Sequence, residues 1–269
     1  MMPRSVWLLL VVSLMLVSCG SGYSSSNNNA SGEGGSAGGG NSGGNSAQDV
    51  DGVFSAVASN GYTFTTIILP NEKLYGIYGT ISGNQLLLDG LITGQGTTNG
   101  TSYNASVTDF SFTGTVSSGT FSASGFSGAS MDGSLAESGN VTTFTAASDL
   151  GSVWDYGTTF QTPASPSAIS GSWTGTLLDG MTTTVTISSN GSLTGSSSGC
   201  LFTGTVVPDS SKDNFYDVSL TFGGSPCSFS NQTANGIAVE YLLSDGVTNQ
   251  FLAAVTIGNS GGTVFAAER

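Results

Sequence analysis

Tyr62–Ile81 reads YTFTTIILPNEKLYGIYGTI and contains two runs rich in Thr, Ile and aromatic residues. The first run ends at Leu69, a polar turn follows at Pro70-Asn71-Glu72, and the second run begins at Lys73. Short alternating runs of apolar and polar residues on either side of a turn indicate two antiparallel strands. Because this pattern continues to the C-terminus and no apolar stripe of helical spacing persists over three turns, we expect an all-β fold.

The runs fall into two sets of about eight predicted strands each, as turn signals recur along the chain. We expect one β module at residues 49–147, a linker at 148–168 and a second β module at 169–269. In the linker, Trp154, Tyr156 and Phe160 are expected to pack, and one turn of helix is expected near Pro163–Ala168. The modules resemble each other at their starts and ends: Gly52–Ala56 corresponds to Gly171–Gly175, and Val141–Ala147 to Gly262–Ala267. A duplication explains this, and convergence of similar β-rich sequence is the alternative.

Two small antiparallel β-barrels in tandem are the predicted architecture, with two β-sandwiches as the alternative. Closing a sheet into a barrel removes its exposed edges, and glycines within strands permit the tight bends of a barrel. Transmembrane barrels are disfavoured because strands of about five to eight residues are shorter than the roughly nine to eleven that such barrels need. Asp-Gly pairs, which favour hairpin turns, are expected to form turns at five places: Asp51-Gly52, Asp89-Gly90, Asp132-Gly133, Asp179-Gly180 and Asp245-Gly246.

The N-terminus has the features of an export signal. Arg4 precedes an apolar run from Val6 to Val17 that is too short to span a bilayer and fits a signal peptide, which we place at residues 1–18. Leu16–Cys19 resembles the lipobox of bacterial lipoproteins. This resemblance implies cleavage before Cys19, lipidation of Cys19, anchoring in the lipid bilayer through acyl chains, and an outer-membrane location in the cell envelope. Residues 19–48 then carry the lipidated cysteine and a flexible tether rich in Gly, Ser and Asn.

Composition excludes several functional classes. The 269-residue chain has no histidine, four Lys and Arg residues in total and a net charge of −13. Without histidine it cannot form a Ser-His-Asp triad or an imidazole metal site. With so few basic residues it lacks the positive patch that nucleic-acid binding requires. We therefore expect no catalytic residue, no bound cofactor, no metal and no nucleic-acid partner.

Cys200 and Cys227 are the cysteines that remain after Cys19 is assigned to lipidation. In an exported chain, two cysteines in one module indicate a disulfide, and they flank a predicted hairpin of Leu201–Val207 with Phe215–Phe222. A redox or metal-binding thiol pair is the alternative, although the CxxC spacing typical of such pairs is missing. Aromatic residues of the first module, Tyr62, Phe64, Tyr75 and Tyr78, either line a cavity or fill the interior.

The body of the chain resembles lipoproteins of proteobacteria that are built from paired small β modules, and in outline it is similar to lipocalin-like and transferrin-binding-protein-like barrels. The resemblance is strongest over residues 169–269. The residues that carry this resemblance are Gly171–Thr176, Gly199–Val206 and Gly261–Ala267. The resemblance transfers no functional residue. Three hypotheses follow: a non-enzymatic binding or structural protein of the cell envelope, a carrier of a small apolar ligand inside one barrel, and a carboxylate-based enzyme. Two Asp or Glu side chains gathered in one cavity would favour the third.

Overall fold

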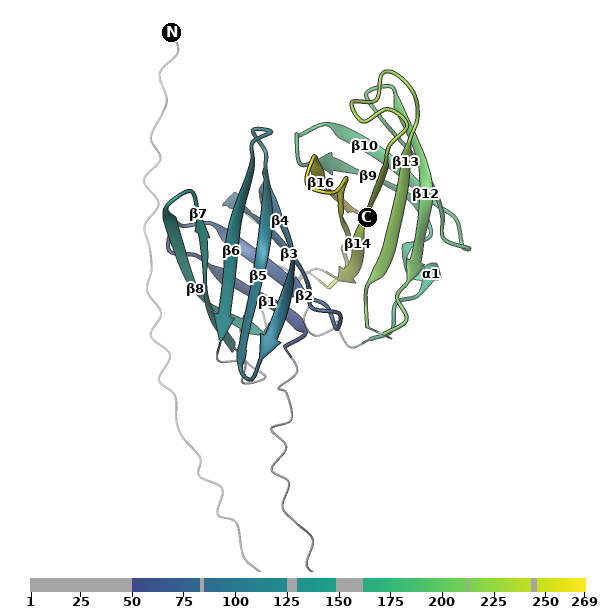
Figure 1. Ribbon diagram of the computed structural model, residues 1–269. Coiled ribbons are helices and arrows are strands. Elements are labelled where there is room, and N and C mark those ends of the chain that lie inside the picture. Colours follow the sequence, from purple (N-terminus) through teal and green to yellow (C-terminus); the bar gives the residue numbers. More distant parts are fainter. Residues whose placement is uncertain (1–49, 83–84, 125–129, 149–161, 212, 243–245) are drawn as a thin grey trace, which may run out of the picture. The chain divides into compact units, whose positions relative to one another are not determined.

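The computed structural model describes residues 50–82, 85–124, 130–148, 162–211, 213–242 and 246–269. These residues form two antiparallel β-barrels in tandem, with one short helix between them in the sequence (Figure 1). The predicted all-β fold class is therefore confirmed, and the architecture is a pair of barrels rather than a pair of sandwiches. The predicted signal peptide, Cys19, the tether and the linker residues Trp154, Tyr156 and Phe160 lie outside the described residues.

Barrel 1 has a simple order in which each strand pairs with the next one along the chain. It closes where β8 pairs with β1, through Phe54 with Ser148 and Ser55 with Ala147. Closure gives each strand a hydrogen-bonded neighbour on both sides. The strands are β1 (Gly52–Val57), β2 (Thr63–Ile68), β3 (Lys73–Ser82), β4 (Gln85–Asn99), β5 (Ser102–Ser111), β6 (Val116–Ser124), β7 (Ser130–Glu137) and β8 (Asn140–Ser148).

Barrel 2 repeats the same order after helix α1 (Pro166–Ile169), which is the turn of helix expected near this point. It closes where β16 pairs with β9, and one of the three residue pairs there joins Ala267 to Gly175. The strands are β9 (Gly171–Leu177), β10 (Thr182–Ile187), β11 (Ser192–Ser197), β12 (Cys200–Pro208), β13 (Tyr216–Phe222), β14 (Thr233–Leu242), β15 (Asn249–Thr256) and β16 (Gly262–Glu268).

The first strands of the two barrels match in detail. β1 and β9 each begin with a glycine of positive φ, 147° at Gly52 and 116° at Gly171. Two residues later each strand carries a buried aromatic side chain, Phe54 in β1 and Trp173 in β9. The sequence correspondence between the two modules therefore coincides with equivalent strands, and the duplication that would explain it stays a prediction.

Two of the predicted Asp-Gly turns are wrong because the pairs lie within strands. Asp89-Gly90 lies inside β4 and Asp132-Gly133 inside β7. Asp89 is the extra residue of a β-bulge opposite β3, and a Cβ atom on Gly90 would approach the Tyr78 ring to within 2.0 Å. Gly133 similarly leaves room for a phenylalanine ring on the neighbouring strand β8. The tertiary need for a residue without a side chain therefore outweighs the local turn preference at both places.

The predicted turn at Asp179-Gly180 is present, with Gly180 at a φ of 78° between β9 and β10. The predicted turn at Asp51-Gly52 is also wrong, because Gly52 is the first residue of β1 and the pair leads into that strand rather than closing a hairpin. Of the fifth pair, Asp245 lies outside the described residues.

One end of barrel 2 is closed by α1 and a buried tryptophan. The Trp173 indole N–H donates a hydrogen bond to the Ile169 carbonyl at 2.7 Å, and both side chains are fully buried. The Arg269 guanidinium lies 3.8 Å from the Trp173 ring and donates hydrogen bonds to the carbonyls of Ala168 and Ser170. These contacts hold the helix over the barrel, so this end is filled with side chains.

Candidate functional site

Each barrel is hollow at one end. In both barrels it is the end where odd-numbered strands finish and even-numbered strands begin. The space in barrel 2, here called the apolar cavity, measures about 390 Å³. The space in barrel 1, called the acidic cavity, measures about 230 Å³. Since ligand sites in proteins occupy roughly 300–1,000 Å³, the first is of ordinary size and the second suits a very small ligand.

The apolar cavity is walled mainly by inward-facing side chains from strands around barrel 2. Aliphatic and aromatic groups dominate, because alternate residues of each strand face the interior and these positions are apolar in the sequence. Six of the lining residues show this composition: Val185, Leu193, Val218, Phe222, Phe251 and Phe265.

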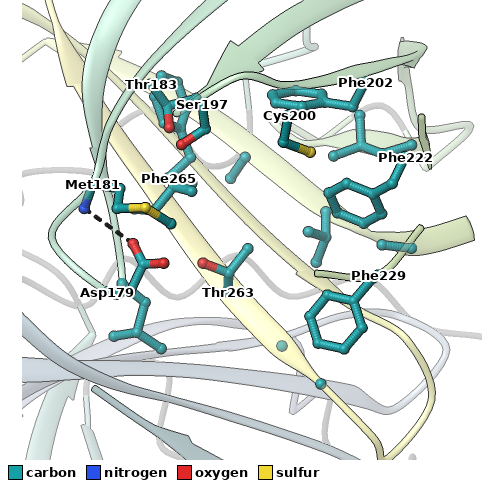
Figure 2. A pocket seen from close by; sticks show the side chains of 18 of the residues that line it. Asp179, Met181, Thr183, Ser197, Cys200, Phe202, Phe222, Phe229, Thr263 and Phe265 are labelled. Atoms are coloured by element: carbon teal, nitrogen blue, oxygen red, sulfur yellow. Dashed lines mark hydrogen bonds between the residues drawn. The ribbon is translucent and has the colours of Figure 1, made fainter. Parts of the chain in front are cut away.

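Two hydroxyl groups interrupt the apolar wall. Thr183 on β10 and Ser197 on β11 lie directly opposite each other in the strand register, and Figure 2 shows them next to each other at the cavity. Their side chains are 1% and 6% exposed, yet neither hydroxyl oxygen has a hydrogen-bond partner. Leaving a buried hydroxyl unpaired costs roughly 1–3 kcal/mol. A ligand group that pairs with these oxygens would offset that cost.

The loop between β13 and β14 forms part of the cavity mouth. The predicted Cys200–Cys227 disulfide is present and ties this loop to the start of β12, with 4.6 Å between the two Cα atoms. Phe229, in the same loop, contacts Phe222 with ring centroids 6.2 Å apart. Its ring lies over Gly261, where a Cβ atom would come within 2.4 Å of it. The disulfide therefore fixes a loop whose residues line the opening (Figure 2).

The acidic cavity of barrel 1 combines aromatic walls with two carboxyl groups. Asp109 on β5 and Glu137 on β7 both face it, and none of its lining residues is Lys or Arg. Five aromatic residues surround the space: Tyr62, Phe64, Tyr78, Phe121 and Phe144. A carboxylate without a cationic neighbour is costly to bury, so a positively charged ligand in this cavity would be electrostatically favoured.

Hydrogen bonds hold the two acidic side chains in place. The Tyr78 hydroxyl donates to both carboxylate oxygens of Asp109 at 3.0 Å, and the Ser117 hydroxyl donates to Glu137 Oε1 at 3.1 Å. Burial, reinforced by the charge of Glu137, raises the pKa of Asp109 to about 6 despite the opposing effect of the Tyr78 hydrogen bond. Burial and the Asp109 charge also raise the pKa of Tyr78, so its hydroxyl keeps its proton.

This arrangement meets one requirement of the carboxylate-based enzyme hypothesis, since two acidic side chains share a cavity. Acid–base catalysis uses carboxyl groups whose pKa values are separated by their surroundings. The Asp109 carboxylate already accepts a hydrogen bond from Tyr78, and Glu137 accepts one from Ser117. The pair does not define a reaction.

Some of these residues were anticipated from the sequence and others were not. Tyr62, Phe64 and Tyr78 line the acidic cavity, whereas Tyr75 is buried elsewhere. The hydroxyl pair of Thr183 with Ser197 and the acidic pair of Asp109 with Glu137 were not predicted. Each pair joins different strands, so only the strand register reveals it.

Within the described ranges, no three or more Cys, Asp or Glu side chains are grouped to hold a metal ion. Within the same ranges, no helix is both long enough and apolar enough to cross a membrane.

Comparisons with known proteins show resemblance in structure alone. Neither protein-family models nor curated proteins match the chain. Among solved structures, transferrin binding protein B from Neisseria meningitidis is 10% identical with a TM-score of 0.29, and the alignment covers 78% of this chain. The chain spans 64% of the length of that protein.

Two other solved structures are similar to the same degree. A candidate outer membrane protein from Bacteroides fragilis is 10% identical with a TM-score of 0.27, and 83% of this chain and 99% of that one align. A protein of unknown function from Nostoc punctiforme is 12% identical with a TM-score of 0.25, covering 81% and 94%. At such scores these similarities carry no argument about function. The function proposed below therefore depends on the two barrels and their cavities.

Proposed function

We propose that barrel 2 binds a small, largely apolar molecule that carries one hydrogen-bonding group. The observation that supports this most directly is that the hydroxyl groups of Thr183 and Ser197, both in the wall of the apolar cavity, lack a hydrogen-bond partner. An apolar wall provides affinity through burial of surface, and a few placed polar groups fix the orientation of the ligand. The proposal corresponds to the carrier hypothesis derived from the sequence.

The geometry supports a particular orientation for this ligand. Trp173 and α1 fill one end of barrel 2, so the ligand enters at the opposite end, beside the disulfide loop. The two hydroxyl groups sit in the half of β10 and β11 nearest this opening, because Thr183 is the second residue of β10 and Ser197 is the last residue of β11. The polar group of the ligand therefore lies near the mouth, and its apolar part points toward Val185 and Leu193.

Filling the cavity tests the proposal. The native chain is expected to bind N-phenyl-1-naphthylamine with a rise in probe fluorescence, and Ala234→Phe is expected to weaken this binding at least tenfold. Ala234 lines the cavity and is 1% exposed, so a phenyl ring there occupies the ligand volume. Ala136→Phe, on the exposed side of β7, is the matched control and should bind the probe normally. Equal binding by both variants would overturn the proposal.

The hydroxyl pair is tested separately with 1-octanol as a competitor of the probe. Thr183→Val with Ser197→Ala keeps the shape of the wall but removes both oxygens. It should weaken octanol binding about fivefold, which corresponds to one hydrogen bond of about 1 kcal/mol. Because the same change removes two unpaired buried groups, the unfolding midpoint should not fall. A lowered midpoint together with unchanged octanol affinity would contradict the assigned role.

We also propose that the chain is anchored in the bacterial cell envelope through Cys19. The support is the lipobox-like sequence Leu16–Cys19 after an apolar run of signal-peptide length. Cells expressing the full chain should incorporate labelled palmitate into it, and Cys19→Ala should abolish the label. Cys200→Ala is the control that keeps Cys19 and should retain the label. Labelling that persists in Cys19→Ala would refute the anchor.

A further inference from the structure

We propose that the acidic cavity of barrel 1 is a second binding site, which takes a small organic ammonium ion. This site is separate from the apolar cavity, because the two cavities share no lining residue. Three properties of the cavity lead to this ligand class: its aromatic walls, its uncompensated carboxyl groups and its size.

The aromatic walls provide the first argument. Tyr62 meets Tyr78 edge to face with ring centroids 5.4 Å apart, and Phe64 meets Phe144 in the same way at 4.7 Å. Phe121 stacks on Phe144 at 5.4 Å. Aromatic rings grouped around a small space are the surroundings that alkylammonium groups prefer, because the negative faces of the rings attract a diffuse positive charge.

The carboxyl groups provide the second argument. Asp109 accepts hydrogen bonds from the Tyr78 hydroxyl and Glu137 from the Ser117 hydroxyl, at the distances given above, and no Lys or Arg is among the described residues that line the cavity. In the described part of barrel 1 the cationic side chain is Lys73, the first residue of β3, five positions before Tyr78, and it does not line the cavity. A bound cation would therefore supply the positive charge that the chain itself does not place there.

Size and wall chemistry decide between an organic cation and a metal ion. A hard metal ion prefers six or more oxygen ligands around it, and this cavity offers mainly rings and aliphatic groups beside its two carboxyl groups. A volume of about 230 Å³ exceeds what a bare ion needs and suits a compact ammonium compound. Choline is thus a suitable probe, and its neutral isostere 3,3-dimethyl-1-butanol has nearly the same shape without the charge.

Asp109 makes the binding of a cation in this cavity depend on pH. The titratable residues that line the cavity are Tyr62, Tyr78, Asp109 and Glu137. The Asp109 carboxyl titrates at a pKa of about 6, so it is protonated below that pH and loses its charge. Choline affinity should therefore fall as the pH decreases through about 6, and this step should be missing from Asp109→Asn.

Calorimetric titration of the folded chain with choline is the deciding experiment. At pH 7.5 the native chain should bind choline at least tenfold more tightly than 3,3-dimethyl-1-butanol. Asp109→Asn and Tyr62→Leu should each weaken choline binding at least fivefold, one by removing charge and the other by removing a ring. Asp132→Asn is the matched control, because Asp132 is exposed on the same barrel and accepts a hydrogen bond from Thr145 at 2.7 Å.

The outcomes separate this proposal from its rivals. Equal affinity for choline and its neutral isostere, or no choline binding at millimolar concentration, would overturn it. Calcium binding without choline binding would also overturn it and make the cavity a metal site. Ala234→Phe, which blocks the apolar cavity, should leave choline affinity unchanged, so failure of the function proposed for barrel 2 is distinguishable from failure here.

Discussion

Trp173→Ala should unfold barrel 2 at temperatures where the native chain remains folded. The Trp173 side chain is fully buried, lies 5.3 Å from the Phe251 ring centroid and donates its hydrogen bond to Ile169. Truncating a buried tryptophan to alanine costs about 3–5 kcal/mol, and the lost hydrogen bond adds about 1 kcal/mol. Because a whole domain is stable by only about 5–15 kcal/mol, this is a large share of the total.

Chemical denaturation followed by near-ultraviolet and far-ultraviolet circular dichroism measures the effect. Leu201→Ala is the matched control, since Leu201 lies on β12 with 65% of its side chain exposed. The control should change the free energy of unfolding by no more than about 0.5 kcal/mol. A Trp173→Ala chain as stable as the control would show that α1 and Arg269 close the barrel without the indole.

Removing the Cys200–Cys227 disulfide should have the second largest effect. The bond joins residues 27 apart in sequence, and the chain-entropy model assigns about 3.5 kcal/mol to a loop of this size. Cys200→Ser with Cys227→Ser should therefore lower the unfolding midpoint strongly. The native chain treated with a reducing agent should behave like the double variant, which separates the lost bond from any effect of the serine side chains.

The same change should also act on the apolar cavity. Pro226, Ser228 and Phe229 of the β13–β14 loop line its mouth, and the disulfide is the covalent link between this loop and β12. With the loop released, a bound naphthylamine probe should dissociate faster, and stopped-flow fluorescence measures that rate. If the double variant matches the oxidised native chain in both stability and probe dissociation rate, the disulfide neither stabilises barrel 2 nor holds the mouth of the apolar cavity.

Much of the fold was predictable because strands depend on local pattern. The alternating runs correctly gave two barrels of consecutive antiparallel strands, and the cysteines flank the predicted hairpin that β12 and β13 form. The Asp-Gly predictions failed at Gly90 and Gly133 for a different reason. There the glycine makes room for an aromatic ring on a neighbouring strand. The residues next to the glycine in the sequence do not show which ring that is.

The cavities were less predictable than the strands. Thr183 belongs to a run of three threonines and Ser197 to a run of three serines, so composition does not distinguish the residue that faces inward. A shift of one residue in strand register would turn each of them outward. Asp109 and Glu137 are likewise separated by a whole intervening strand, β6, and the register of β5, β6 and β7 places both side chains at one cavity.

The glycines beneath aromatic rings have a consequence for how such barrels diversify. Tyr78 rests over Gly90 at the acidic cavity, and Phe229 rests over Gly261 at the mouth of the apolar cavity. One added methyl group at either glycine would push the ring above it aside and reshape the adjoining space. A shift of the Tyr78 ring would also disturb its hydrogen bonds to Asp109, whereas Thr183 and Ser197 lie on β10 and β11 and would keep their places if Phe229 moved. At the apolar cavity, ligand size and ligand chemistry are thus encoded at separate positions, so selection can alter the first while keeping the second. At the acidic cavity, a change at Gly90 would alter both together.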